Sequence, residues 1–166
     1  VRKFGFIKFV KKINLEQNLH LKNLGPEPLE KKFNFSYFKQ YIINKNRTIK
    51  DILMDQKFVS GLGNIYVNET LFFSGIKPKK KVKNLSEREI RKIIKFTKRI
   101  LSKAIALGGS SIKNFSSDNG KKGLFQQYFC VYGKKDEKCS KKSCGSNIIK
   151  IVISNRATFY CDKCQK

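Results

Sequence analysis

Four cysteines in the last part of the chain have the spacing of a metal site. Cys139 and Cys144 are separated by four residues, Cys161 and Cys164 by two, and sixteen residues lie between the pairs. Two thiolate pairs joined by a hairpin can supply four sulfur ligands, and a tetrahedral set of four sulfurs suits zinc. Such a site has no open coordination position, so we predict one structural Zn²⁺ ion. Two local disulfides are the alternative.

The residues around these cysteines favour the metal site. Gly145 follows the first pair and permits the tight turn that brings two sulfurs to one ion. Cys130 lies in an alternating apolar run and is predicted to be a small buried apolar residue, not a fifth ligand. The nearby lysines outweigh the charge of four thiolates and predict a cationic tip: Lys138, Lys141, Lys142, Lys163 and Lys166.

A second candidate site is the glycine-rich turn G-L-G-N over residues 61–64. Two glycines one residue apart allow a tight turn, and Asn64 then stands at the start of a helix. The N–H groups at that helix end and the Asn64 amide could bind a phosphate. The same four residues also occur in plain turns.

Regular elements must position both sites. Residues 147–154 and 156–161 are β-branched and aromatic, which predicts a hairpin with its turn at Ser154 and Asn155. Ser86 and Glu89 form a capping box that starts an amphipathic helix of about 21 residues, ended by Gly108 and Gly109. Further helices are predicted over residues 35–43, 49–54 and 64–73.

The first residues differ in kind. Val1 to Lys12 alternate and are aromatic, which predicts a strand or hairpin arm that has no partner in this chain. Asn14 to Pro28 form a polar connection, in which Pro26 and Pro28 fix an extended or turning path. We interpret this part as a linker from a sheet domain.

The charge of the chain indicates an acidic partner. Lys and Arg number 37 against 12 Asp and Glu, which gives a net charge of +25, and nucleic acid is the leading candidate partner. The alternative is that the lysine excess has no binding role. The basic face of the long helix would then simply be exposed to solvent. No apolar run approaches the roughly 18 residues of a membrane-spanning helix.

Several motifs, in order, resemble bacterial formamidopyrimidine-DNA glycosylase. They are L-G-P-E-P-L at 24–29, M-D-Q-K-F-V-S-G-L-G-N-I-Y at 54–66, G-I-K-P at 75–78, and V-Y-G followed by N-R-A-T-F-Y-C-x-x-C-Q-K. The resemblance covers nearly the whole chain. It implies a mostly α fold with a small β element, in which a helix-two-turns-helix domain precedes a four-cysteine zinc ribbon.

The resemblance also implies a function. The family excises oxidised purines such as 8-oxoguanine from duplex DNA and cleaves the strand at the abasic site, after the base has been rotated out of the duplex. We therefore expect double-stranded DNA with an oxidised base or abasic site as partner, no membrane, a monomer, and a cytoplasmic, nucleoid-associated bacterial protein.

Individual residues match the family's DNA-binding positions. Arg2 matches the residue that faces the unpaired base opposite the lesion, called the orphaned base. Phe4 matches the apolar residue that inserts into the base stack. Lys57, Asn64 and Arg156 match phosphate contacts, with Arg156 at the turn of the ribbon hairpin. Residues 109–123 resemble the lesion-capping loop.

The resemblance has gaps as well. The family's nucleophile is an N-terminal Pro beside a Glu, and neither is matched, so we expect the catalytic half to lie outside these 166 residues and the chain alone to be inactive. The first cysteine pair is wider than the family's usual two-residue spacing. The implied divisions are 1–23 (remnant strand and linker), 24–125 (helix-two-turns-helix domain) and 126–166 (zinc ribbon).

Two other functions stay open at this point. One is an endonuclease VIII-like glycosylase for oxidised pyrimidines, which shares the fold. The other is a non-enzymatic basic zinc-ribbon protein of ribosomal type.

Overall fold

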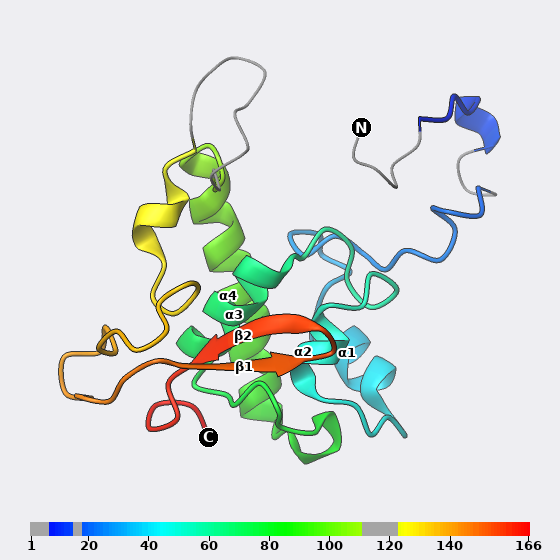
Figure 1. The fold of residues 1–166 in the computed structure, drawn as a ribbon. Coiled ribbons are helices and arrows are strands. Elements are labelled where there is room, and N and C mark those ends of the chain that lie inside the picture. Colours follow the sequence, from blue (N-terminus) through cyan, green and yellow to red (C-terminus); the bar gives the residue numbers. More distant parts are fainter. Residues whose placement is uncertain (1–6, 15–17, 111–122) are drawn as a thin grey trace.

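The computed structural model describes residues 7–14, 18–110 and 123–166, and this part of the chain is mostly helical (Figure 1). Its elements follow in order: η1 (Lys12–Asn14), α1 (Phe35–Ile42), α2 (Ile49–Leu53), α3 (Asn64–Ser74), η2 (Val82–Asn84), α4 (Glu87–Ala106), η3 (Phe125–Tyr128), β1 (Ile149–Ile153) and β2 (Arg156–Tyr160). The two strands form one antiparallel hairpin in which Ile153 pairs with Arg156. The predicted fold class is confirmed in these elements.

Local sequence signals define the helix ends. The Glu89 N–H donates to Ser86 Oγ and the Ser86 N–H donates to Glu89 Oε2, so the predicted capping box starts α4. The N-terminus of α2 is capped by Thr48, whose Oγ1 accepts from the Asp51 N–H. Helix α3 ends at Gly75, which has a φ of 74° and therefore the left-handed conformation that glycine adopts freely.

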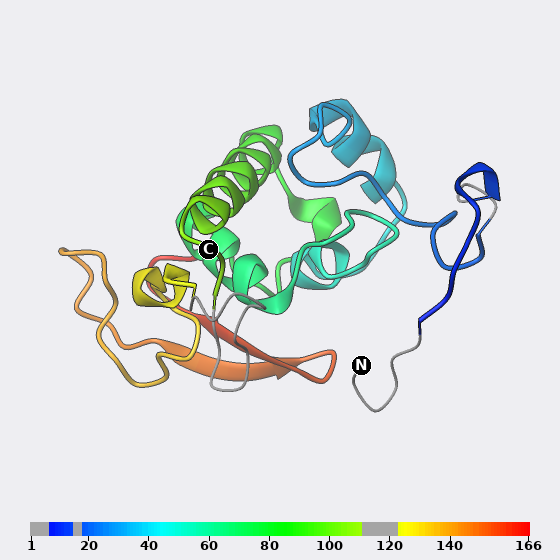
Figure 2. The ribbon, with the colours of Figure 1, turned by 90° about the horizontal axis from the view of Figure 1, so that it is seen from above.

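Helix α3 lies at the centre of the molecule. It packs against α4 on one side and against β2 on the other, as Figures 1 and 2 show. Every residue from Val67 to Phe72 is buried, including the polar Asn68, Glu69 and Thr70. Buried polar groups need hydrogen-bond partners, and Asn68 and Glu69 find them in the ribbon.

The hydrophobic core has two main clusters. The larger one joins α1, α2, α3 and α4 around Phe33, Phe38 and Phe58, all fully buried. The second surrounds the cysteines and contains Phe72, Val131, Ile148 and Phe159. Because Phe72 lies on α3, this helix contributes to both clusters.

The strand predicted over Val1 to Lys12 is not formed in its described part. Residues 7–11 have no regular structure, and Lys12 begins a 3-10 turn. Ile7 and Phe9 expose 75% and 96% of their surface. A strand needs a neighbour for its backbone hydrogen bonds and its apolar face, and the described residues offer none to this segment.

No helix in the described part of the chain is sufficiently long and apolar to cross a membrane.

Candidate metal centre and nucleic-acid interface

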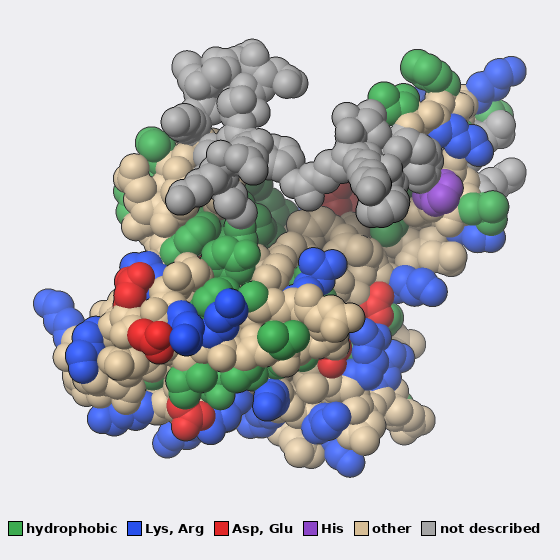
Figure 3. Space-filling model, viewed as in Figure 1, with side chains coloured by type: hydrophobic (Ala, Val, Ile, Leu, Met, Phe, Trp, Pro, Cys, Tyr) green, Lys and Arg blue, Asp and Glu red, His purple; other side chains and the backbone are tan. Residues whose placement is uncertain are grey.

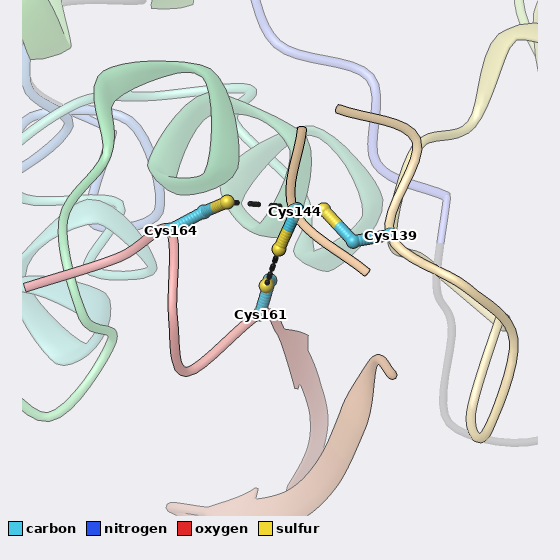
Figure 4. Close-up of side chains that lie close together, drawn as sticks. All are labelled: Cys139, Cys144, Cys161 and Cys164. Atoms are coloured by element: carbon cyan, nitrogen blue, oxygen red, sulfur yellow. Dashed lines mark hydrogen bonds between the residues drawn. The ribbon is translucent and has the colours of Figure 1, made fainter. Parts of the chain in front are cut away.

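The four cysteines of the two predicted pairs point toward one another (Figure 4). Their sulfur atoms all lie within 4.8 Å of one another, with 3.4 Å between Cys144 and Cys161 and 3.9 Å between Cys139 and Cys164. A tetrahedral zinc with Zn–S bonds of about 2.3 Å would separate its sulfurs by roughly 3.8 Å. The four side chains therefore fit one metal ion, and Cys130 does not belong to the cluster.

The electrostatics of the cluster also favour a cation. Backbone donation, chiefly from the Ser146 N–H, lowers the pKa of Cys144 to about 6, whereas burial raises the pKa of Cys164 to about 12. Four thiolates at neutral pH thus require a divalent ion that stabilises their charge.

Each cysteine pair has its own local support. In the wider first pair, the Cys139 N–H donates to the Ser146 carbonyl and the Cys144 N–H to that of Lys141. Gly145 has a φ of 68°, as its predicted role in the turn requires. The second pair is fixed by Gln165, which is fully buried and whose side chain accepts from the Cys161 N–H and donates to the Ile76 carbonyl. This contact, which sequence reasoning missed, joins the metal cluster to the turn after α3.

Arg156 stands at the hairpin turn, where it was predicted. Ser154 and Asn155 have φ values of 48° and 59°, which define a type I′ turn, and Arg156 is the first residue of β2. Its side chain is exposed and lines a cleft of about 480 Å³ together with Arg47, Lys50 and Gln56. The predicted turn is confirmed.

Asn64 begins α3 as predicted, directly after the glycine turn. Its side-chain amide donates to the Ala157 carbonyl at 3.0 Å, next to Arg156. One turn further along α3, Asn68 Oδ1 accepts from the Phe159 N–H at 2.7 Å. The structure thus brings Asn64 and the Arg156 strand together, and both asparagines dock the hairpin on α3.

Glu69, the next residue of α3, holds the first segment of the ribbon. Its carboxylate accepts three consecutive backbone N–H groups, from Cys130, Val131 and Tyr132, at 2.9 to 3.0 Å. Burial raises the pKa of Glu69, and the three N–H donors oppose that rise. Sequence reasoning missed this residue, since its only sequence signal is a charged side chain within an apolar helix.

Lys57, Arg2 and Phe4 complete the predicted set. Lys57 is exposed in the turn after α2, where its N–H donates to Asp55 Oδ1. Arg2 and Phe4 lie outside the described residues, as does most of the predicted lesion-capping loop. Basic side chains are spread over the face that carries the hairpin, and acidic ones are few (Figure 3).

Lys50 is the buried charged residue that sequence reasoning missed most clearly. It is 1% exposed, and its Nζ donates to Thr158 Oγ1 at 2.7 Å and to the Ala157 carbonyl at 3.1 Å. The sequence shows one lysine among many, and only the long-range fold reveals that this one is buried. Burial, and then the charge of Arg156, lower the pKa of Lys50 to about 8.

This pKa predicts a pH-dependent stability. Between pH 8 and about 10.5 the unfolded chain binds a proton that folded Lys50 has released, so the free energy of unfolding should rise with pH in this window. Relative to a Lys50→Met variant, the free energy of unfolding of the wild type should increase by up to about 3 kcal/mol between pH 7 and pH 10.5. Urea denaturation of both proteins at several pH values measures the difference, in which the other lysines cancel. Parallel pH curves would contradict the assignment.

The comparisons with known proteins agree with this architecture. The family model "Formamidopyrimidine-DNA glycosylase H2TH domain" matches residues 24–116, which is more than half of the chain. The chain belongs to the formamidopyrimidine-DNA glycosylase family. The predicted helix-two-turns-helix domain of that family is therefore confirmed.

Curated members of the formamidopyrimidine-DNA glycosylase family align with the whole chain. The Bacillus subtilis protein is 44% identical over 165 residues, which cover 99% of this chain and 59% of that protein. The Listeria monocytogenes EGD-e protein is 41% identical over 166 residues, or 100% of this chain and 60% of that protein. The chain thus spans about 60% of the length of these relatives.

Solved structures of the same family superpose closely. The Lactococcus lactis Fpg mutant G226P, in complex with DNA containing Fapy-dG, matches with a TM-score of 0.87 and 38% identity, over 95% of this chain and 57% of that one. Fpg (MutM) from Thermus thermophilus matches with a TM-score of 0.82 and 34% identity, over 87% of this chain and 55% of that one.

Proposed function

We propose that this chain is the DNA-binding portion of a base-excision-repair glycosylase that removes oxidised purines and nicks the abasic strand. The observation that carries the proposal is the hairpin docked on the start of α3, which sets Arg156 beside the glycine turn, in a fold shared with proteins solved on damaged DNA. MutM has been solved with DNA containing carbocyclic 8-oxo-G, which supports an oxidised purine as the lesion.

The DNA-binding roles extend the sequence predictions. We assign phosphate contacts to Lys57, Asn64 and Arg156. We assign to Arg2 the contact with the unpaired base opposite the lesion, and to Phe4 the insertion into the base stack. An amide nitrogen carries two N–H groups, so Asn64 can donate to Ala157 and to a phosphate at once. The two main core clusters, one within α1 to α4 and one around the cysteines, support a division into a helical part, residues 24–125, and a ribbon, residues 126–166, with Phe72 of α3 packed in the ribbon's cluster.

The metal in this proposal is one structural zinc ion bound by Cys139, Cys144, Cys161 and Cys164. A four-sulfur site leaves no coordination position for substrate. When bound, the ion joins the two cysteine pairs and neutralises half of their thiolate charge.

Binding assays with the 166-residue chain test the DNA proposal. The chain should bind a duplex with an abasic-site analogue more tightly than an undamaged duplex of the same length and sequence. It should also prefer that duplex to a structured RNA of similar charge. Preference for the RNA would favour a ribosomal-type protein instead, and equal affinity for all three would show only non-specific attraction to phosphates and contradict the proposal.

Replacing Arg156 should weaken the electrostatic part of this binding. If Arg156 neutralises one phosphate, Arg156→Ala lowers the slope of log affinity against log salt by about 0.9. The matched control is Lys135→Ala, which also removes one exposed positive charge, from a lysine that pairs with Asp136. Fluorescence anisotropy over a salt series measures both slopes. Equal slopes for wild type and Arg156→Ala would remove Arg156 from the phosphate contacts.

A further inference from the structure

The hairpin turn is held from α2 by Asp51. Asp51 Oδ1 accepts from Ser154 Oγ at 2.6 Å, across 103 residues of sequence. Its other oxygen accepts from Thr48 Oγ1 at 2.7 Å, and Thr48 is the N-cap of the same helix. The carboxylate is therefore fixed to its own helix on one side and to the turn on the other.

The turn needs such support. Ser154 and Asn155 both have positive φ, a conformation in which serine is unfavourable because its Cβ approaches the backbone. Type I′ turns commonly carry Asn-Gly or Asp-Gly for this reason, and this turn has no glycine. The turn sequence alone therefore specifies its conformation weakly.

An acidic residue at this place is otherwise unfavourable for DNA binding. Asp51 lines the same cleft as Arg156, together with Arg47, Lys50 and Asp55. A carboxylate there repels the phosphates that Arg156 would contact. Although burial alone would raise the pKa of Asp51, the hydrogen bonds from Ser154 and Thr48 and the charge of Arg47 lower it overall, so the group stays ionised at neutral pH.

We propose that Asp51 is the positioning residue for Arg156: by binding Ser154 it fixes the turn and so holds the start of β2 in the orientation that meets the phosphate. The inference rests on the proposed function, because Arg156 acts on DNA only if the chain binds DNA. It assigns to α2 a role in DNA affinity that needs no contact between Asp51 and the nucleic acid.

Two substitutions of Asp51 separate positioning from charge. Asp51→Ala removes a repulsive charge and the bond to Ser154, and we expect affinity for the abasic duplex to fall about fivefold. Asp51→Asn removes the same charge but keeps an acceptor oxygen for Ser154, and it should bind at least as tightly as wild type. If charge alone mattered, both variants would bind more tightly, and that result would overturn the proposal.

Two double variants test the route through the turn. Asp51→Ala combined with Ser154→Gly should recover affinity, because glycine adopts the positive φ at this position without help from Asp51. Asp51→Ala added to Arg156→Ala should cause no further loss, because the positioned group is already gone. No recovery, or a full additive loss, would show that Asp51 acts elsewhere.

A measurement without DNA distinguishes failure of this inference from failure of the proposed function. If the wild-type chain does not bind the duplex, the proposed function fails. NMR relaxation and amide exchange at Asn155 and Arg156 in the free protein then decide the positioning role. Increased mobility of these residues in Asp51→Ala, with the rest of the ribbon unchanged, supports it, and unchanged mobility overturns it.

Discussion

Removal of the metal should unfold the ribbon while helices α1 to α4 stay folded. The apolar cluster around the cysteines is small, and structural zinc contributes on the order of 10 kcal/mol of binding free energy that a chelator would withdraw. The larger helical cluster contains none of the cysteines. Amide exchange before and after chelation should therefore show lost protection in residues 130–166 and retained protection in α4. Affinity for DNA should also fall, because the hairpin that carries Arg156 unfolds.

Cysteine variants provide the controls for this result. Cys161→Ser removes one ligand and should lower the metal content as well as the protection of the hairpin. Cys130→Ser changes a cysteine outside the cluster and should leave about one zinc ion per chain. A hairpin that stays protected in metal-free protein would refute the structural role of the ion.

The Glu69→Ala variant should be among the least stable single variants of the chain. It leaves three consecutive backbone N–H groups without their acceptor, the one of Val131 buried and those of Cys130 and Tyr132 part-buried, and an unsatisfied buried donor costs about 1 to 3 kcal/mol. We expect the free energy of unfolding to fall by about 3 kcal/mol or more, with the ribbon affected first. Chemical denaturation followed by ribbon and helix probes measures the loss.

Two further variants calibrate this effect. Glu69→Gln keeps one acceptor oxygen, which in the wild type serves Val131 and Tyr132, and should lose less stability than Glu69→Ala. Glu137→Ala removes an exposed carboxylate that pairs with Lys134 at 3.6 Å and should change stability by less than about 0.5 kcal/mol. If Glu69→Ala matched Glu137→Ala, the carboxylate would not be what holds the segment after η3.

Sequence reasoning succeeded where neighbouring residues decide the structure. The capping box at Ser86, the turn at Ser154 and Asn155, and the start of α3 at Asn64 are local features, and all three are confirmed. The four cysteines were also assigned correctly to one cluster, because their spacing restricts how the sulfurs can meet.

Sequence reasoning failed where contacts between distant residues decide the structure. Lys50 and Glu69 are charged residues whose burial depends on partners about 60 to 108 positions away. Nothing near Lys50 in the sequence distinguishes it from solvated lysines, and Glu69 stands out only as a charged residue within an apolar helix. For the segment from Val1 to Lys12, the sequence pattern predicted a strand that the structure lacks. Residues 7–12 form no strand, because the described residues offer them no neighbouring strand.

The adjacent anchors on α3 have a consequence for how the ribbon can change in evolution. Asn68 binds β2 at Phe159, and Glu69 binds the chain at 130–132, so both arms of the ribbon are attached to one short stretch of a central helix. The loop between Cys139 and Cys144 lies between these anchors and is exposed over residues 140–143, so a change in its length need not shift the attachment. That loop can thus change in length while the metal cluster stays joined to the turn after α3 and the hairpin turn keeps its register on the helical domain.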